Sequence, residues 1–314
     1  MKLATSTGDY AHFFDSIPDM IGAIGESSFK NVNLEQTGIA ADVGAEWERI
    51  ADEWGNAAAL AGVNLAVSHA PCRHFPHYKA LEDRDDEEYR RDIDIICRSI
   101  QVCGRLGIPR TVVHACAYYT EEFTKEIFYK YNEMFYRDIL PTAEKCGVML
   151  LAENWDGSET HFSTGAQMRE FLDYINHPLL CACWDTAHGN IDKTAREIGQ
   201  YDNISALGDK LKGLHISDNF GNLHHHSWPF AGVINFDSVM QGLLDVGYDG
   251  YFTFEASYTI RHSKNMPMHR SSFRYRGERV TRLLNPSVEL KKKATDLLYE
   301  TGKYILSEYV CFEE

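Results

Sequence analysis

The sequence predicts an α/β fold, a single (β/α)₈ TIM barrel in which eight parallel strands alternate with helices. Short apolar runs of strand character alternate with longer segments of helical period from one end of the chain to the other. Eight such units fit within 314 residues, whereas an open sheet would need more length or a second domain. The alternative is a doubly wound open sheet, but no predicted strand is followed by a dinucleotide-type glycine fingerprint or a phosphate loop.

The eight predicted strands, in chain order, cover residues 2–5, 30–34, 64–69, 111–114, 148–153, 180–185, 213–216 and 251–255. Each is followed by an amphipathic segment that we expect to be a crossover helix. These segments cover residues 14–24, 45–61, 87–106, 121–145, 166–175, 193–211, 236–246 and 287–307. Together they give every strand of the barrel its own helix.

Glycines support the predicted helix ends, because a left-handed residue that closes a helix favours glycine. Gly62, Gly107, Gly147 and Gly247 each fall just past an apolar-periodic stretch. Pro141 is expected to kink or divide the fourth helix. Since no linker-like boundary interrupts the pattern, we expect one domain over residues 1–314.

Composition narrows the possible partners. The formal charge of −15 and a pI near 5.4 oppose binding to a phosphate backbone, so we expect no nucleic-acid partner. No apolar run is long enough to span a membrane, and the first residues lack the apolar stretch of a signal peptide, which favours the cytoplasm. A small polar molecule is the expected ligand.

Polar residues stand at the ends of six successive predicted strands. In chain order they are His69, His114, Glu153, Asp185 with His188 three residues later, His215 and Glu255. One such residue alone is commonly a hydrogen-bonded core group. Strand ends meet at the C-terminal mouth of a barrel, however, and several buried carboxylates there need a compensating cation.

The sequence therefore predicts one divalent metal ion. Glu153, Asp185, His215 and Glu255 offer three carboxylates and one imidazole. This donor set suits Mn²⁺ best, while Mg²⁺, Co²⁺ and Zn²⁺ are the alternatives.

These strand ends resemble a known superfamily. The endings LAENW, WDTAH, HISDN and FTFE, together with HHHSWPFAGVINF leading into GLLDVGYDGYFTFE, are similar to xylose isomerase-like barrels. That superfamily includes sugar isomerases, sugar epimerases and endonuclease IV. The branch of ketose 3-epimerases implies a single metal on Glu153, Asp185, His215 and Glu255, and it implies that His188 contacts the substrate.

The resemblance implies a sugar isomerase or epimerase that removes a proton next to a carbonyl and passes through an enediolate. Glu153 and Glu255 would act as the catalytic pair on opposite faces of the substrate carbon. The residues expected to bind the substrate are His188, His226, His69, His114 and Trp155.

Three alternatives stay open. The same enolate chemistry would make a lyase or deglycosylase acting on an oxidised (3-oxo) glycoside. The endonuclease IV branch would hold three zinc ions and cleave phosphodiesters, although His224 stands where that enzyme has an aspartate. A non-catalytic sugar-binding subunit could keep the same barrel.

A basic insertion is predicted after the eighth strand, at about residues 256–285. Seven arginines and lysines there accompany the single acid Glu278, a net charge of +6. Such a run is commonly a solvated face. It could instead be a lid that binds a phosphate or carboxylate, or a docking segment for another copy of the chain or a partner subunit.

Overall fold

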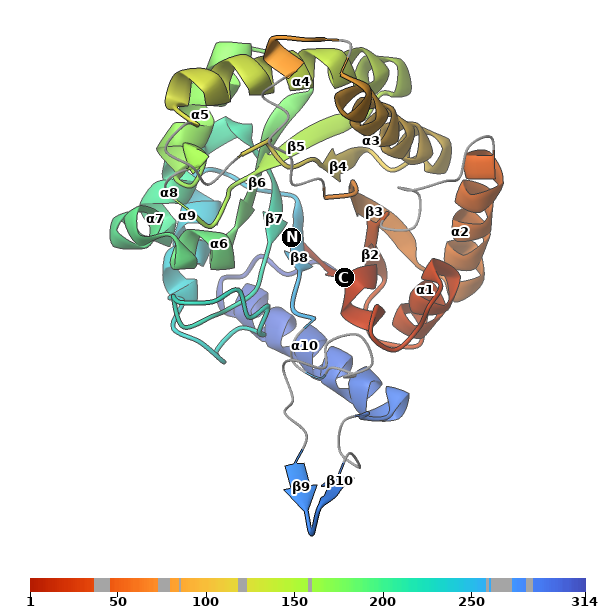
Figure 1. Ribbon diagram of the computed structural model, residues 1–314. Helices are drawn as coiled ribbons and strands as arrows, with labels where there is room; N and C mark the ends of the chain where they lie inside the picture. The colour runs from red at the N-terminus through yellow and green to blue at the C-terminus, as the bar shows by residue number, and fades with distance from the viewer. Residues whose placement is uncertain are drawn as a thin grey trace.

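The computed structural model describes residues 1–36, 46–72, 80–84, 86–117, 123–157, 160–257, 260, 273–280 and 285–314; for residues 273–275 and 278–280 it describes the backbone. Within these residues, eight parallel strands form the predicted barrel, surrounded by helices (Figure 1). The strands are β1 (Lys2–Ser6), β2 (Asn31–Glu35), β3 (Asn64–His69), β4 (Arg110–Val112), β5 (Met149–Glu153), β6 (Leu180–Asp185), β7 (Leu211–His215) and β8 (Tyr251–Phe254).

Neighbouring strands pair in the order β8-β1-β2-β3-β4-β5-β6-β7. Strands β7 and β8, which stand at the two ends of this order, meet through a parallel bridge between Ile216, just beyond β7, and Phe254. The Ile216 amide donates to the Thr253 carbonyl at 2.8 Å, and the Glu255 amide donates to the Ile216 carbonyl at 3.1 Å. This bridge closes the ring.

Seven longer helices cover the outside of the strands: α1 (Ile17–Gly25), α2 (Trp47–Ala61), α3 (Glu87–Leu106), α4 (Lys125–Cys146), α5 (Gly165–Ile175), α9 (Phe236–Asp245) and α10 (Val288–Glu308). Three short helices follow β6: α6 (Thr186–Ile191), α7 (Lys193–Ile198) and α8 (Gln200–Leu207). Two 3₁₀ turns, Thr7–Tyr10 and Gly208–Lys210, complete the described helical elements. Of the helices in the described part of the chain, none has the length and apolar character to cross a membrane.

The predicted glycine caps are present, because α2, α3 and α4 end at Gly62, Gly107 and Gly147 in the left-handed conformation. One helix prediction was wrong. Residues 193–211 form α7, α8 and a 3₁₀ turn because Gly199 and Gly208 have φ angles of 93° and 52°, which interrupt a helix. Pro141 does not divide α4, which runs without interruption from Lys125 to Cys146.

The part of the barrel interior that lies away from the C-terminal ends of the strands is apolar. Val112, Leu151, Cys181 and Cys183 pack there as a small cluster, separate from the larger core between strands and helices. Gly213 belongs to this layer, since a Cβ atom on it would lie 2.6 Å from the Leu151 side chain. The apolar packing leaves the C-terminal ends of the strands as the place where polar side chains gather.

All eight cysteines lie in the described part of the chain and are free thiols.

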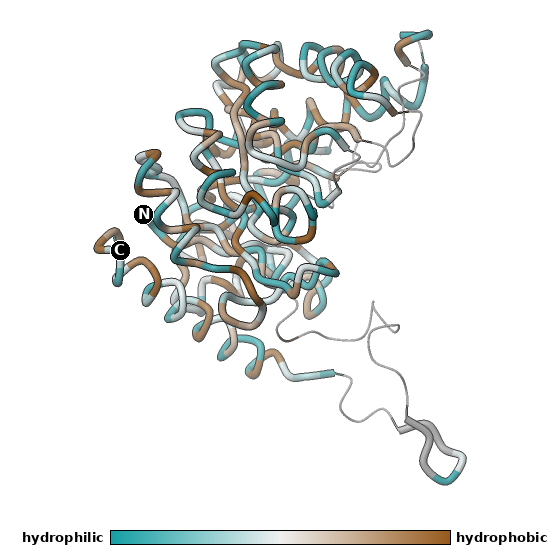
Figure 2. Tube along the Cα trace, turned by 90° about the vertical axis from the view of Figure 1, so that its left-hand side faces the viewer, coloured by the Kyte–Doolittle hydropathy of each residue, from teal (hydrophilic) through white to brown (hydrophobic). Residues whose placement is uncertain are grey.

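An antiparallel hairpin, β9 (Phe273–Tyr275) and β10 (Glu278–Val280), lies apart from the barrel in both views (Figures 1 and 2). Its turn residues Arg276 and Gly277 have φ angles of 53° and 84°, as a tight hairpin turn requires. Most of the basic side chains predicted at 256–285 lie outside the described residues; Arg276 is exposed. The roles of this segment and the single-domain organisation stay predictions.

Candidate active site

The structure brings together the four residues predicted to bind a metal. Glu153 ends β5, Asp185 ends β6, His215 ends β7 and Glu255 follows β8 directly. One potential ligand atom from each lies within 4.8 Å of the others. Glu153, Asp185 and His215 are buried, and the Glu255 side chain is 17% exposed. Parallel strands ending at one level therefore place three carboxylates and an imidazole in one small space.

Glu153 is the centre of the contacts. Its Oε1 lies 2.6 Å from Nδ1 of His215, and its Oε2 lies 2.8 Å from Nε2 of His114. Nε2 of His69 is 3.5 Å from the same Oε2. The Glu255 carboxylate lies 3.6 Å from Nδ1 of His215. The two predicted substrate residues on β3 and after β4 thus converge on the same carboxylate as the predicted metal ligand on β7.

The sequence analysis did not identify Asn154, whose hydrogen bonds hold Asp185 and His188 in place. Its side-chain amide accepts from the Asp185 backbone amide at 2.7 Å and donates to the Asp185 carbonyl at 3.0 Å. Its own carbonyl lies 2.8 Å from Nδ1 of His188, so that nitrogen is the donor and Nε2 is left for other partners. Asp185 also caps α6 by accepting from the His188 amide at 2.8 Å. The position of Asn154 immediately after Glu153 was the available signal.

The loop after β7 brings the consecutive histidines to the same mouth. The His224 ring lies 3.8 Å from that of His226 and 4.4 Å from that of His188, between ring centroids. Nδ1 of His226 donates to the Glu255 carbonyl at 2.9 Å. His226 therefore stands beside the strand-eight glutamate.

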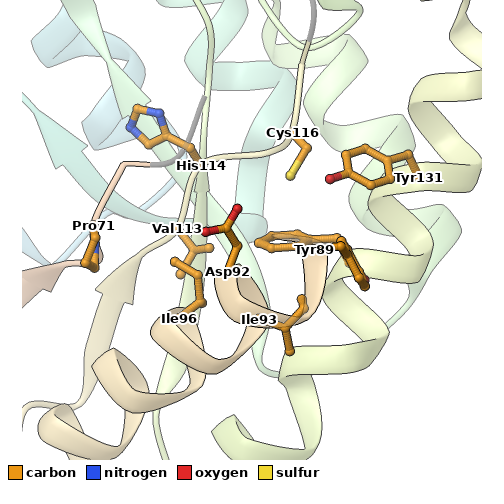
Figure 3. Close-up of a pocket in the computed structure, with 10 residues that line it drawn as sticks. Pro71, Tyr89, Asp92, Ile93, Ile96, Val113, His114, Cys116 and Tyr131 are labelled. Carbon is orange, nitrogen blue, oxygen red and sulfur yellow. The ribbon is translucent and has the colours of Figure 1, made fainter. Parts of the chain in front are cut away.

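Trp155 is buried and packs against the His114 ring. Its indole nitrogen donates to the Ala115 carbonyl at 2.9 Å, and its ring meets the His114 ring edge to face at 4.9 Å. A cavity of about 20 Å³ is lined by His114 and by side chains of α3 and α4. Figure 3 shows how these side chains lie around it. That volume holds about one water molecule. This cavity is therefore too small for a ligand much larger than water.

The charges in the site shift the pKa values of its members. Burial opposes ionisation of Glu153, but the charges of His215 and His114 outweigh it and hold the pKa of Glu153 well below its usual range. Burial likewise opposes protonation of His215, yet Glu153 and Glu255 raise its pKa to about 10. The pKa of Glu255 is raised by burial, despite His215 and His226. The two glutamates thus differ in proton affinity.

The residues present fit a divalent cation. Among the described residues, Oδ2 of Asp185 and Nε2 of His215 have no hydrogen-bond partner, although both side chains are buried. Buried polar atoms without partners are costly, and a cation bound to the carboxylate and to the neutral imidazole, in place of the imidazole proton, would satisfy both. Three carboxylates and one imidazole form a donor set for a hard or borderline ion such as Mn²⁺. The geometry thus suits one ion between β5, β6, β7 and β8.

A parallel barrel with polar side chains at the C-terminal ends of its strands is the architecture of a large class of enzymes, whose active sites lie at that face. Residues 31–274 match the family model described as xylose isomerase-like TIM barrel, so the chain belongs to this family.

Curated relatives include sugar epimerases. L-ribulose 3-epimerase from Methylomonas sp. (strain DH-1) is 32% identical over 94 residues, 30% of each chain. Ketose 3-epimerase from Arthrobacter globiformis is 29% identical over 115 residues, 36% of this chain and 37% of the relative. Probable endonuclease 4 from Cenarchaeum symbiosum (strain A) is 24% identical over 162 residues, 47% and 54% of the two chains. The matched segments thus span between 30% and 54% of the length of these relatives.

Solved structures share the whole fold. D-psicose 3-epimerase from Clostridium cellulolyticum H10, solved with D-tagatose, has a TM-score of 0.73 at 16% identity and covers 98% of this chain and 99% of its own. The apo form of 3-keto-D-glucoside 4-epimerase from E. coli has a TM-score of 0.67 at 17% identity, with coverage of 96% and 99%. At these identities the likeness establishes the barrel architecture.

Proposed function

We propose that this protein is a sugar isomerase or epimerase that depends on a divalent metal and transfers a proton at the carbon next to a sugar carbonyl. The observation that carries the proposal is the group formed by Glu153, Asp185, His215 and Glu255, whose ligand atoms lie within 4.8 Å of one another. Relatives named as epimerases of ribulose and ketoses support the same activity. The ligand is a small sugar, with no role for nucleic acid or a membrane.

Those four residues would hold the metal, for which Mn²⁺ is the first choice. When bound, the ion supplies Lewis-acid polarisation of the substrate carbonyl and stabilises a developing enediolate. Glu153 and Glu255 stand on β5 and after β8, and we assign them the proton transfers on the two faces of the substrate carbon. A proton taken by one glutamate and returned by the other inverts the carbon.

The histidines bind and orient the substrate oxygens in this proposal. Donation from Nδ1 of His188 to the Asn154 carbonyl fixes its ring and leaves Nε2 for another partner. His226 stands beside Glu255, while His69 and His114 stand beside Glu153. Trp155 packs edge to face on His114 and keeps that ring in place.

Replacing His188 by alanine should raise KM for the sugar about tenfold or more, while the protein keeps its metal. The loss of one hydrogen bond to a substrate oxygen accounts for this effect, because the four proposed ligands remain. Steady-state kinetics together with elemental analysis of the purified variant measures both properties. Loss of the metal together with activity would instead assign His188 to the metal site.

A phosphodiesterase holding several metals is the second candidate function. Two further groups of potential ligands, His69–His114–Glu153 and Asp185–His188–His224, overlap the four-residue group. The probable endonuclease 4 among the relatives also favours it. The acidic charge of the chain opposes a DNA substrate.

Elemental analysis combined with a deuterium-exchange screen tests the proposal. Ketoses, sugar phosphates and 3-oxo-glycosides are incubated in D₂O with the protein, and exchange at carbon is followed by NMR. One equivalent of metal and deuterium incorporation without bond cleavage are expected. Elimination from a 3-oxo-glycoside would indicate the lyase or deglycosylase. A content of three zinc ions would indicate the phosphodiesterase. Full activity in a metal-free protein would overturn the proposal.

A further inference from the structure

Cys183 lies next to the proposed metal ligands, on the side away from the mouth. It stands two residues before Asp185 on β6, so both side chains face the interior of the barrel. In the register of the sheet it pairs with Glu153 on β5 and with Gly213 on β7. The neighbours of the thiol are therefore the central carboxylate of the site and a residue without a side chain.

Cys183, Glu153 and His215 form a group of potential metal ligands of their own. One ligand atom of each lies within 4.8 Å of the other two, and all three side chains are buried. Among the described residues, Nε2 of His215 has no hydrogen-bond partner. Around a tetrahedral Zn²⁺ ion, bonds of about 2.0–2.3 Å place the ligand atoms roughly 3–4 Å apart. Small movements of the side chains therefore bring all three ligand atoms onto one ion.

The burial of the thiol does not separate it from an ion in the site. Asp185 and His215, two of the residues in the four-residue group, are as deeply buried as Cys183. The Glu255 side chain is 17% exposed and marks the open side of the site. An ion that reaches the four-residue group already contacts Glu153 and His215, which the cysteine group shares with it. The position beside Cys183 is therefore the next one inward from the first.

The sulfur changes which ions the site prefers. Three carboxylates and an imidazole suit a hard or borderline ion, whereas a thiolate selects thiophilic ions such as Zn²⁺. Coordination forms the metal–sulfur bond and releases the thiol proton to solvent, so no oxidant or reductant is consumed. Among the ligand groups found in the described part of the chain, none includes Cys181, although it lies in the same strand two residues earlier. Position, and not residue type alone, therefore distinguishes Cys183.

We propose that Glu153, Cys183 and His215 form a second metal position, farther from the mouth, that takes a thiophilic divalent ion such as Zn²⁺. An ion there engages Glu153 and His215, so it excludes the ion held by the four-residue group. The inference rests on the proposed function, and it assigns Cys183 as the residue through which a thiophilic ion inhibits the protein.

Titration of the metal-free protein with Cd²⁺ tests this position, because a cadmium–thiolate bond gives a charge-transfer absorption band in the ultraviolet. All proteins in the test carry Cys72→Ser, which removes the exposed thiol that lies 3.4 Å from Nδ1 of His114. The first equivalent of Cd²⁺ should produce the band in this parent protein, and Cys183→Ala should abolish it. Cys181→Ala, the same change two residues earlier, is the matched control and should keep it.

The relative affinity for two ions gives a second readout. Cys183→Ala should weaken Cd²⁺ binding about tenfold or more and change Mn²⁺ binding less than about threefold, since Mn²⁺ uses the four-residue group. Competition with a chromophoric chelator measures both affinities. Cys183→Ser keeps the volume of the side chain and replaces sulfur by a hard oxygen, so it should lose the band as well. Circular dichroism checks the fold of each variant.

The position is overturned by a full band in the folded Cys183 variants, by a parent protein that binds Cd²⁺ without the band, or by one that binds no Cd²⁺. The deuterium-exchange assay separates this result from the proposed function. In a protein that exchanges deuterium with Mn²⁺ bound, inhibition should need about tenfold more Cd²⁺ after Cys183→Ala, and equal inhibition would contradict the inhibitory role. A band that depends on Cys183 in a protein that exchanges deuterium into no sugar leaves the metal position standing and removes the proposed function.

Discussion

Replacing Glu153 by glutamine is expected to lower deuterium incorporation into the sugar about 10³-fold or more, with the barrel intact. Proton transfer by a positioned carboxylate contributes about 10²–10⁴-fold to a rate. Glutamine keeps the shape but cannot take the proton, and its NH₂ group would face His215 or His114. Exchange measured by NMR in D₂O, with circular dichroism as the folding check, tests this expectation.

Glu255→Gln should show a loss of similar size, since the second glutamate acts on the other face. Metal content is measured for both variants, so that loss of a ligand and loss of a base are distinguished. Glu48→Gln serves as the control, because it makes the same change at an exposed position of α2. Wild-type exchange in both metal-loaded variants would remove the proposed roles of the two glutamates.

Replacing Lys291 by methionine is expected to destabilise the protein by about 3–5 kcal/mol, because it leaves a buried carboxylate without its partner. Nζ of Lys291 lies 2.6 Å from Oδ1 of Asp9, and both side chains are 2% exposed. Thr295 adds a 3.4 Å hydrogen bond to Oδ2 of Asp9, and Nζ lies 5.5 Å from the Tyr10 ring. This contact joins α10 to the turn after β1, so its loss weakens the attachment of the last helix.

Lys292→Met is the matched control for this prediction. Lys292 pairs with the exposed Glu26 at the surface, where such pairs contribute about 0–1 kcal/mol. Urea unfolding of both variants measures the difference. Replacing Asp9 by leucine in the Lys291→Met background should recover part of the loss, because no unpaired charge then remains. Equal stability of the two lysine variants would contradict the assigned role of the buried pair.

Much of the barrel was predictable because local chemistry repeats along the chain. The bounds of β3 and β6 agree with the predicted 64–69 and 180–185, since both are compact apolar runs with a polar last residue. Glycines after three helices marked their ends. The same regularity predicts that the polar residues at six strand ends lie at one mouth of the barrel.

Other features depend on contacts between distant segments or on a boundary of one residue. The predicted second strand stopped at residue 34, and so Glu35 was not recognised as a strand end. The fourth strand ends at Val112, which leaves His114 beyond it, although the prediction included that residue. The role of Asn154 arises from hydrogen bonds to Asp185 on the next strand, which its position directly after Glu153 does not by itself reveal.

The junction of β7 and β8 has a consequence for how the molecule holds its shape. The backbone joins these strands through one bridge and two hydrogen bonds, fewer than a full ladder provides. His215 and Glu255 flank this junction, and a shared ion would bind the two strands to each other through their side chains. Binding of the ion would then stabilise the barrel at the junction where the backbone provides the fewest hydrogen bonds. Affinity for the ion and stability of the closed barrel would therefore be thermodynamically linked.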